Sequence, residues 1–181
     1  YKPIKPEVTE KKKTHPIKTI KILCSNKYFI LITLAFAIIY TSLGLTGGSR
    51  IYYAKYVLGN EMINSTMTLF NYIPTILTIM LIPIFAKKFG KIKALFVGFL
   101  FYGAGLILEI AGPVNLLMIY GGLVLQGIGH AALYSCLFAI VGDVVDYSEW
   151  KDGIREEGLT YSVTSFGQKI GTGLGTAALG W

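Results

Sequence analysis

The chain has 181 residues, of which 53% are hydrophobic and 15% charged, with a formal net charge of +7. This composition is too apolar for a soluble domain of this length and indicates a membrane protein. The positive charge could suggest nucleic-acid binding, but the lysines lie beside membrane-length apolar segments and do not form a basic face with stacking aromatics. Cys24 and Cys136 are isolated, so neither a metal-binding spacing nor a disulfide framework is visible.

The first segment, residues 1–25, is polar, lysine-rich and proline-containing, so it cannot bury enough apolar surface to fold alone. We predict a cytoplasmic loop or linker here, followed by an incomplete helical bundle over residues 26–181. The alternation of Lys with aliphatic residues from Ile17 to Cys24 fits either a segment lying along lipid headgroups or a plain linker. Because the chain begins without Met and stops directly behind an apolar segment, we expect a fragment of a longer protein.

Five apolar windows follow, and each is long enough for a helix to cross about 30 Å of hydrocarbon. We therefore predict an all-α membrane protein with five transmembrane helices. Pro74 and Pro83 predict kinks in the second helix, which membrane helices tolerate because neighbours can satisfy the freed carbonyl groups. The predicted spans are about Tyr28 to Tyr53, Ser65 to Ala86, Ala94 to Ile110, Asn115 to Val141 and Gly158 to Leu179.

The distribution of Lys and Arg predicts the orientation of these spans, because such residues are retained on the cytoplasmic side. They concentrate before the first span, between spans two and three, and in the acidic segment between spans four and five. The other side carries Lys55, with Arg50 near the end of the first span. We expect a multi-pass protein of the plasma or inner membrane, with residues 1–25 and the loop 143–157 in the cytoplasm.

Lys169 is an ionisable residue in a predicted membrane helix. It lies about 12 residues past Glu157, which corresponds to roughly 18 Å along a helix and places it near the midplane. A charge there costs between about 3 and more than 10 kcal/mol, so it needs a partner, a water-filled cavity or a functional reason. We interpret Lys169 as part of a substrate or ion pathway, and a purely structural ion pair is the alternative.

The helix that carries Lys169 also contains Gly167, Gly171 and Gly175 at intervals of four residues. Small residues at this spacing allow two helix backbones to approach closely, so helix packing is the favoured interpretation. The polar residues Thr164 and Ser165 could instead face a cavity.

Span four places Gln126, His130 and Tyr134 on one stripe of a helix. Tyr134 could stack on a sugar or pack in the core, and His130 could be functional or simply hydrogen-bonded. Arg50 and Glu109 lie near the outer ends of their spans, where each can reach headgroups or water. If Arg50 faces a cavity, its guanidinium suits an anionic substrate such as a sugar acid.

The segment between spans four and five gathers most of the acidic residues of the chain. Asp143, Asp146 and Glu149 are three residues apart and would share one face of a continuing helix, where Arg155 could bridge them. Glu157 stands where the next helix begins, and the positive N-terminal end of that helix's dipole stabilises its negative charge. The cluster fits a latch that closes the inner mouth of a pathway, or a solvated loop with good helix capping.

These residues carry a family resemblance. The chain resembles the glycoside-pentoside-hexuronide:cation symporter family, whose best-known member is the melibiose permease. The resemblance lies in the run Asp143, Asp146, Tyr147 and Glu149, followed by Arg155, Glu157, Tyr161 to Val163 and Lys169. The stretch Ile51 to Gly59 is similar to the end of that family's seventh helix. The resemblance implies a major facilitator superfamily helical bundle, of which this chain would form helices 7 to 11 of about twelve.

The resemblance also implies the activity: symport of a sugar, glycoside or hexuronide with Na⁺ or H⁺ by alternating access. The implied partners are the substrate, the lipid bilayer and the missing N-terminal half of the transporter, with no nucleic acid, metal or cofactor besides the coupling cation.

By the same resemblance, individual residues take roles. Lys169 would lie near both the sugar and the cation, and Thr164, Ser165 and Tyr134 would contact the sugar. Arg50 departs from the permease pattern, so galactoside specificity is not implied. The expected inner-gate charge network consists of Asp143, Asp146, Glu149, Arg155 and Glu157.

Two other functions are alternatives to sugar symport. A lysolipid or amphiphile transporter of the same family would show a hydrophobic lateral cavity near the first span. A membrane-embedded enzyme has little support, because no paired His/Asp set or Ser/His arrangement falls within the spans. We therefore expect a transporter and not an enzyme.

Overall fold

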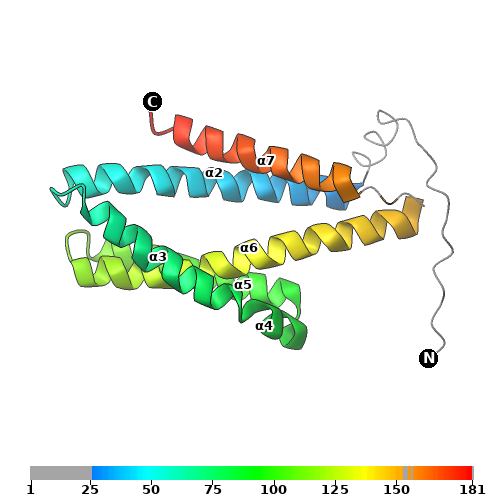
Figure 1. Ribbon diagram of the computed structural model, residues 1–181, viewed down its shortest axis with the longest axis horizontal. Coiled ribbons are helices and arrows are strands. Elements are labelled where there is room, and N and C mark those ends of the chain that lie inside the picture. The colour runs from blue at the N-terminus through cyan, green and yellow to red at the C-terminus, as the bar shows by residue number, and fades with distance from the viewer. Residues whose placement is uncertain (1–25, 153–154, 156, 181) are drawn as a thin grey trace.

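The computed structural model describes residues 26–152, 155 and 157–180, and the predicted loop over residues 1–25 lies outside these. The described residues form helices and contain no strand, as the composition predicts. The helices are α2 (Lys27–Tyr56), α3 (Ile63–Ile79), α4 (Ile82–Phe89), α5 (Lys91–Ala111), α6 (Leu116–Asp152) and α7 (Glu157–Ala177) (Figure 1).

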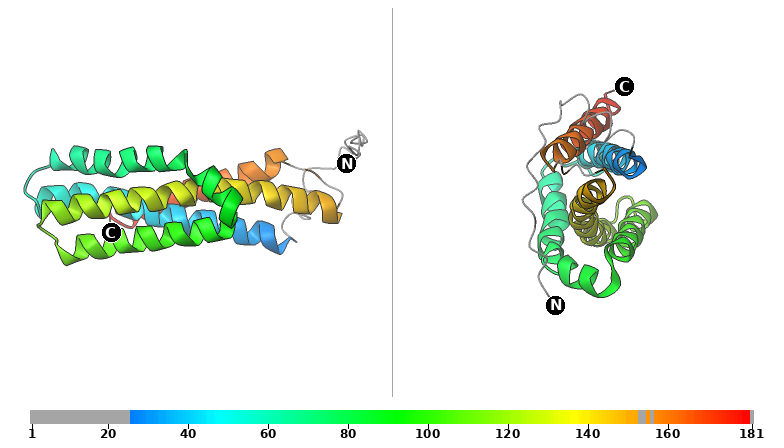
Figure 2. Two further views of the ribbon diagram at one scale, coloured as in Figure 1. Left: turned by 90° about the horizontal axis from the view of Figure 1, so that it is seen from below. Right: turned by 90° about the vertical axis from the view of Figure 1, so that its right-hand side faces the viewer.

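The helices lie side by side in an elongated bundle (Figures 1 and 2). One end of the bundle, called the charged end below, is where α2, α5 and α7 begin and α4 and α6 finish. α6 contacts each of the other described helices. α2 and α7 form a parallel pair along one side of α6, and α3, α4 and α5 cover another side.

The prediction of membrane helices is largely confirmed. In the described residues, α2, α5 and α6 are each long and apolar enough to cross a membrane, and the bent pair α3 and α4 makes a possible fourth span. α7, the predicted fifth span, is not among them, because its Gly, Ser and Thr residues and Lys169 make it less apolar.

The predicted second span is broken into two helices that meet at 53°. The break lies at residues 80 and 81, and Pro83 follows in the first turn of α4, where a backbone N–H would have no partner within the helix. The kink predicted at Pro83 is therefore confirmed, whereas α3 runs through Pro74.

The fourth helix extends further than predicted. Val141 was the predicted end, but α6 continues to Asp152, so the acidic segment begins as helix. The extension is amphipathic: Val144 and Ser148 are buried while the acidic residues face outward. The amide Nδ2 of buried Asn26, which caps α2, donates to the Ser148 hydroxyl over 3.0 Å. This packing against α2 explains why the helix persists beyond the apolar window.

The glycines of α7 pack against α2, as predicted. A Cβ added at Gly44 of α2 would lie 2.7 Å from the Thr172 carbonyl oxygen, and one added at Gly171 or Gly175 would collide with the carbonyls of Ala37 and Thr41. The two backbones therefore touch along a stripe that only small residues allow.

Candidate functional site

The charged end holds the acidic residues predicted as a gate. Arg155 lies among three carboxylates, with Nη1 at 2.5 Å from Glu149 and 3.2 Å from Asp146, and Nε at 2.7 Å from Glu157. The hydrogen bonds to Glu149 and Glu157 raise the pKa of Arg155 further above its ordinary value. These side chains are about half exposed, so solvent screening keeps each pair weak.

Asp143, the fifth predicted gate residue, lies apart from Arg155 and pairs with a residue that sequence reasoning missed. The Nζ of Lys91, at the start of α5, lies 2.6 and 2.8 Å from the two Asp143 carboxylate oxygens and 3.3 Å from the Ala139 carbonyl. The lysine-rich turn before α5 was the available signal. Among the described residues, the charged end thus holds two ion-pair groups, one between α5 and α6 and one that joins α6 to the start of α7 through Arg155.

A polar face on α7 surrounds Lys169. A groove of about 410 Å³ is lined by α7 residues alone: Tyr161, Ser162, Ser165, Phe166 and Lys169. Lys169 is exposed there, and no carboxylate of the described residues lies within ion-pair distance. A purely structural ion pair, the alternative explanation of Lys169, therefore finds no partner for this lysine among the described residues.

Thr164 does not share this face with Ser165. It is fully buried toward α2, and its hydroxyl donates to the carbonyls of Thr160 and Tyr161 in its own helix. The structure therefore brings Ser165 and Lys169 together and places Thr164 behind them, and the predicted sugar contact of Thr164 stays a prediction.

Arg50 and Tyr134 lie within a polar group between α2, α5 and α6. The Arg50 Nη2 donates to Gln126 Oε1 over 2.7 Å. The half-buried Tyr134 ring lies between His130, at 5.8 Å between ring centroids, and Tyr40, at 6.3 Å. Because α7 alone lines the Lys169 groove, the predicted substrate residues occupy two separate places in this structure.

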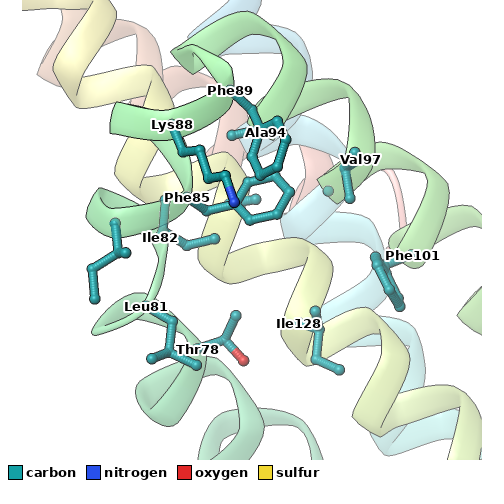
Figure 3. A pocket seen from close by; sticks show the side chains of 13 residues that line it. Thr78, Leu81, Ile82, Phe85, Lys88, Phe89, Ala94, Val97, Phe101 and Ile128 are labelled. Carbon is teal, nitrogen blue, oxygen red and sulfur yellow. The ribbon is translucent and has the colours of Figure 1, made fainter.

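An apolar groove of about 470 Å³ opens at the bend between α3 and α4 (Figure 3). Its lining comes from α3 to α6 and includes Phe85, Phe89, Val97 and Phe101, with Lys88 beside the rings. The lateral cavity expected for an amphiphile transporter was to lie near the first span, and none of the lining residues belongs to α2. The groove therefore does not supply that distinguishing feature.

The described residues hold no group of three His, Cys, Asp or Glu side chains that could bind a metal ion. What the two polar regions offer instead is a cation on an open helix face and a partly buried guanidinium bonded to Gln126, beside helices of membrane length. Such groups suit reversible binding of a polar solute within a membrane.

A family model described as "MFS/sugar transport protein" matches residues 2–181. The chain belongs to this family. The resemblance and the all-α membrane fold predicted from the sequence are thereby confirmed, and the chain is part of an integral membrane protein.

Three relatives illustrate the family. The "Putative sulfoquinovose importer" of Salmonella typhimurium is 30% identical, with 89% of this chain and 35% of the relative covered. The "Isoprimeverose transporter" of Lactiplantibacillus pentosus is 27% identical, with 96% and 37% covered. The "Putative 2,3-dihydroxypropane-1-sulfonate exporter" of Salmonella typhimurium is 27% identical, with 100% and 39% covered. The chain thus spans little more than a third of these relatives' length. No solved structure matches the chain.

Proposed function

We propose that the chain is the greater part of the C-terminal half of a secondary active transporter, and not an enzyme. The transporter carries a sugar, glycoside or hexuronide together with Na⁺ or H⁺ by alternating access. The observation that carries the proposal is the α7 face, where Ser165 and Lys169 are exposed and Lys169 has no ion-pair partner among the described residues, in a chain of this family. An uncompensated cation in a membrane helix is retained where a pathway needs it.

In this proposal, Lys169 serves both the substrate and the coupling cation. Ser165 adds a hydroxyl from the same face, and Tyr134 and Thr164 contribute from behind after rearrangement. The ion pairs of the charged end close the inner, cytoplasmic mouth. They are exposed and individually weak, as a latch that opens in each cycle requires.

Arg50 supports an anionic substrate within this class. Two of the three relatives are named for sulfur-containing substrates, sulfoquinovose and 2,3-dihydroxypropane-1-sulfonate. A guanidinium binds a carboxylate or sulfonate through two parallel hydrogen bonds, and Gln126 holds Arg50 in position for such a contact. One of these relatives is named an exporter, so we expect the ion gradient, and not the fold, to set the direction of net transport.

The test uses the full-length protein in lipid vesicles. Radiolabelled neutral glycosides and sugar acids are offered with and without an inward Na⁺ or H⁺ gradient. We expect saturable accumulation of at least one substrate with a gradient. Lys169→Ala should reduce it to the level of empty vesicles, because the substitution removes the group shared by both sites. The matched control is Lys93→Ala, which removes an exposed lysine at the charged end.

Gradient-driven accumulation at the wild-type level in Lys169→Ala would contradict the role of Lys169. If the wild-type protein moves none of these solutes under any gradient, the proposed transport activity itself is contradicted.

A further inference from the structure

The α5–α6 interface buries polar side chains at closely packed glycines. A Cβ added at Gly105 of α5 would lie 2.5 Å from the Gly122 carbonyl oxygen, so the two backbones touch at this pair. The same contacts place Glu109 over Gly122 and Gln126 over Gly105: added Cβ atoms would lie 3.0 Å from Glu109 Cγ and 2.7 Å from Gln126 Cγ. The glycines thus make room for a carboxyl and an amide inside a helix interface.

These side chains contain polar atoms without partners. Four buried side-chain nitrogen or oxygen atoms lack a hydrogen-bond partner in the described part of the chain, and all four lie on α5 and α6 at this interface. They are Tyr102 Oη, Glu109 Oε1, Gln126 Nε2 and His130 Nε2. Buried polar atoms are nearly always hydrogen-bonded, so four exceptions at one interface mark it as a place where a change of protonation or of hydrogen-bond partner can matter.

Arg50 fixes the orientation of the Gln126 amide. A guanidinium has only donors, so the amide atom that faces Arg50 at 2.7 Å must be the oxygen. The Nε2 therefore points away from Arg50 and toward the Glu109 carboxyl, although neither Nε2 nor Oε1 makes a hydrogen bond of ordinary geometry within the described residues. Arg50 is bonded to the amide and not to the carboxyl, although it is close enough to interact with both.

The burial of Oε1 opposes ionisation of Glu109, whereas the nearby Gln126 amide and Arg50 guanidinium favour it. An ionised carboxylate with a buried, unbonded oxygen is strongly disfavoured unless a cation pairs with it directly. In the described part of the chain, the guanidinium beside it is that of Arg50, which is bonded to Gln126.

We propose that Glu109 is a proton-binding site inside the α5–α6 interface. The carboxyl carries a proton while Arg50 is bonded to Gln126, and it ionises when Arg50 turns from the amide to the carboxylate. Uptake of one proton converts the Arg50–Glu109 ion pair into a neutral acid and a guanidinium on Gln126, so charge and protons balance. Because Arg50 belongs to α2, the protonation state of α5 is linked to the contact between α2 and α6.

The groups that face Glu109 come from the two helices around it. α2 supplies Arg50 and Tyr53, whose hydroxyl donates to the Pro113 carbonyl at the end of α5. α6 supplies Gln126, with His130 one turn further along. Tyr102 lies on the same face of α5 and its ring is 5.0 Å from that of His130. Arg50 is the one fixed positive charge among these, so its position controls the charge of Glu109.

The test is infrared difference spectroscopy of the full-length protein in lipid, recorded between acidic and alkaline pH. A protonated carboxyl has a carbonyl band separate from the bands of carboxylates and amides. We expect a titrating carboxylic-acid band in the wild type that is lost in Glu109→Gln. The matched control is Glu61→Gln, which removes an exposed carboxylate that pairs with Lys55 at 2.8 Å, and it should leave the band in place.

Glu109→Asp tests whether loss of the band in Glu109→Gln comes from misfolding, because this variant keeps a carboxyl group on a shorter side chain. This variant should retain a titrating band at a changed frequency. Equal carboxylic-acid bands in the wild type and Glu109→Gln would overturn the proposal, because Glu109 would then not titrate. The measurement requires no transport, so its outcome is independent of the proposed function.

Discussion

The α2–α7 and α5–α6 pairs are both built on glycines, yet they treat polar residues in opposite ways. Along α2–α7 the glycines meet backbone and small residues, and the polar groups Ser165 and Lys169 stand on the outer face. Along α5–α6 the glycines meet the side chains of Glu109, which is partly buried, and Gln126, which is fully buried. Close helix approach therefore has two results here: in α2–α7 the polar side chains lie on the outer face, and in α5–α6 they lie between the helices.

The largest effect is expected at Arg50, which joins α2 of one pair to α6 of the other through its hydrogen bond to Gln126. Arg50→Gln removes a charged donor, and hydrogen bonds to charged groups contribute about 1.5–3 kcal/mol. The affinity for a sugar acid or sulfonate should fall by roughly 10- to 150-fold, while that for a neutral glycoside stays within about twofold. Substrate protection against thermal unfolding of the full-length protein measures both affinities. An equal loss for charged and neutral substrates would contradict the anchoring role.

Gly105→Ala tests the interface that encloses the polar groups. The new methyl group would meet the Gly122 carbonyl, the Gln126 side chain and the Gln126 backbone N at 2.5 to 2.9 Å. Overpacking of this kind destabilises by about 1–3 kcal/mol, which thermal unfolding in detergent would detect. The control is Gly103→Ala on the same helix, where a Cβ meets nothing within 4 Å. Equal melting temperatures for the two variants would show that α5 and α6 are not closely packed.

Gly171→Ala makes the same test of α2–α7, with an expected loss in the lower part of that range of about 1–3 kcal/mol. The added methyl group meets backbone and Cβ atoms of α2 but displaces no buried polar side chain. Gly173→Ala faces open space and should be neutral or slightly stabilising, because Ala favours helix. A loss larger than that of Gly105→Ala would reverse the proposed order of the two interfaces.

Arg155→Ala should have the smallest effect on stability, about 0–1 kcal/mol, because all its partners are exposed. Its effect should appear instead in the balance between inward- and outward-open states, measured by the accessibility of a cysteine placed at the charged end. Added salt should weaken the wild-type latch and leave the variant unchanged. A stability loss above about 2 kcal/mol would indicate a structural and not a gating role.

The sequence predicted the helices well because hydrophobic windows report burial in lipid directly. It predicted the end of α6 poorly, since residues 142–152 are amphipathic and their helical state depends on α2. The α2–α7 glycine packing was readable from its four-residue spacing. The burial of Glu109 Oε1 was not, because the position of Glu109 near a helix end favoured water or headgroups and its contact with α6 depends on how α5 and α6 pair.

The same limit applies to the site residues. Spacing along one helix correctly joins Ser165 with Lys169, which are four residues apart. Spacing does not predict that Thr164 is buried toward α2 or that Asp143 pairs with Lys91 and not with Arg155, because both contacts depend on residues distant in the chain.

The unbroken length of α6 has a mechanical consequence. Its 37 residues form a rod of about 55 Å that carries Gln126 and, about 30 Å further on, Asp146. A straight rod that tilts about its middle swings its two ends in opposite directions. Loosening the latch around Arg155 would then shift Gln126 against Arg50, so spin labels at the two ends of α6 should report one concerted motion.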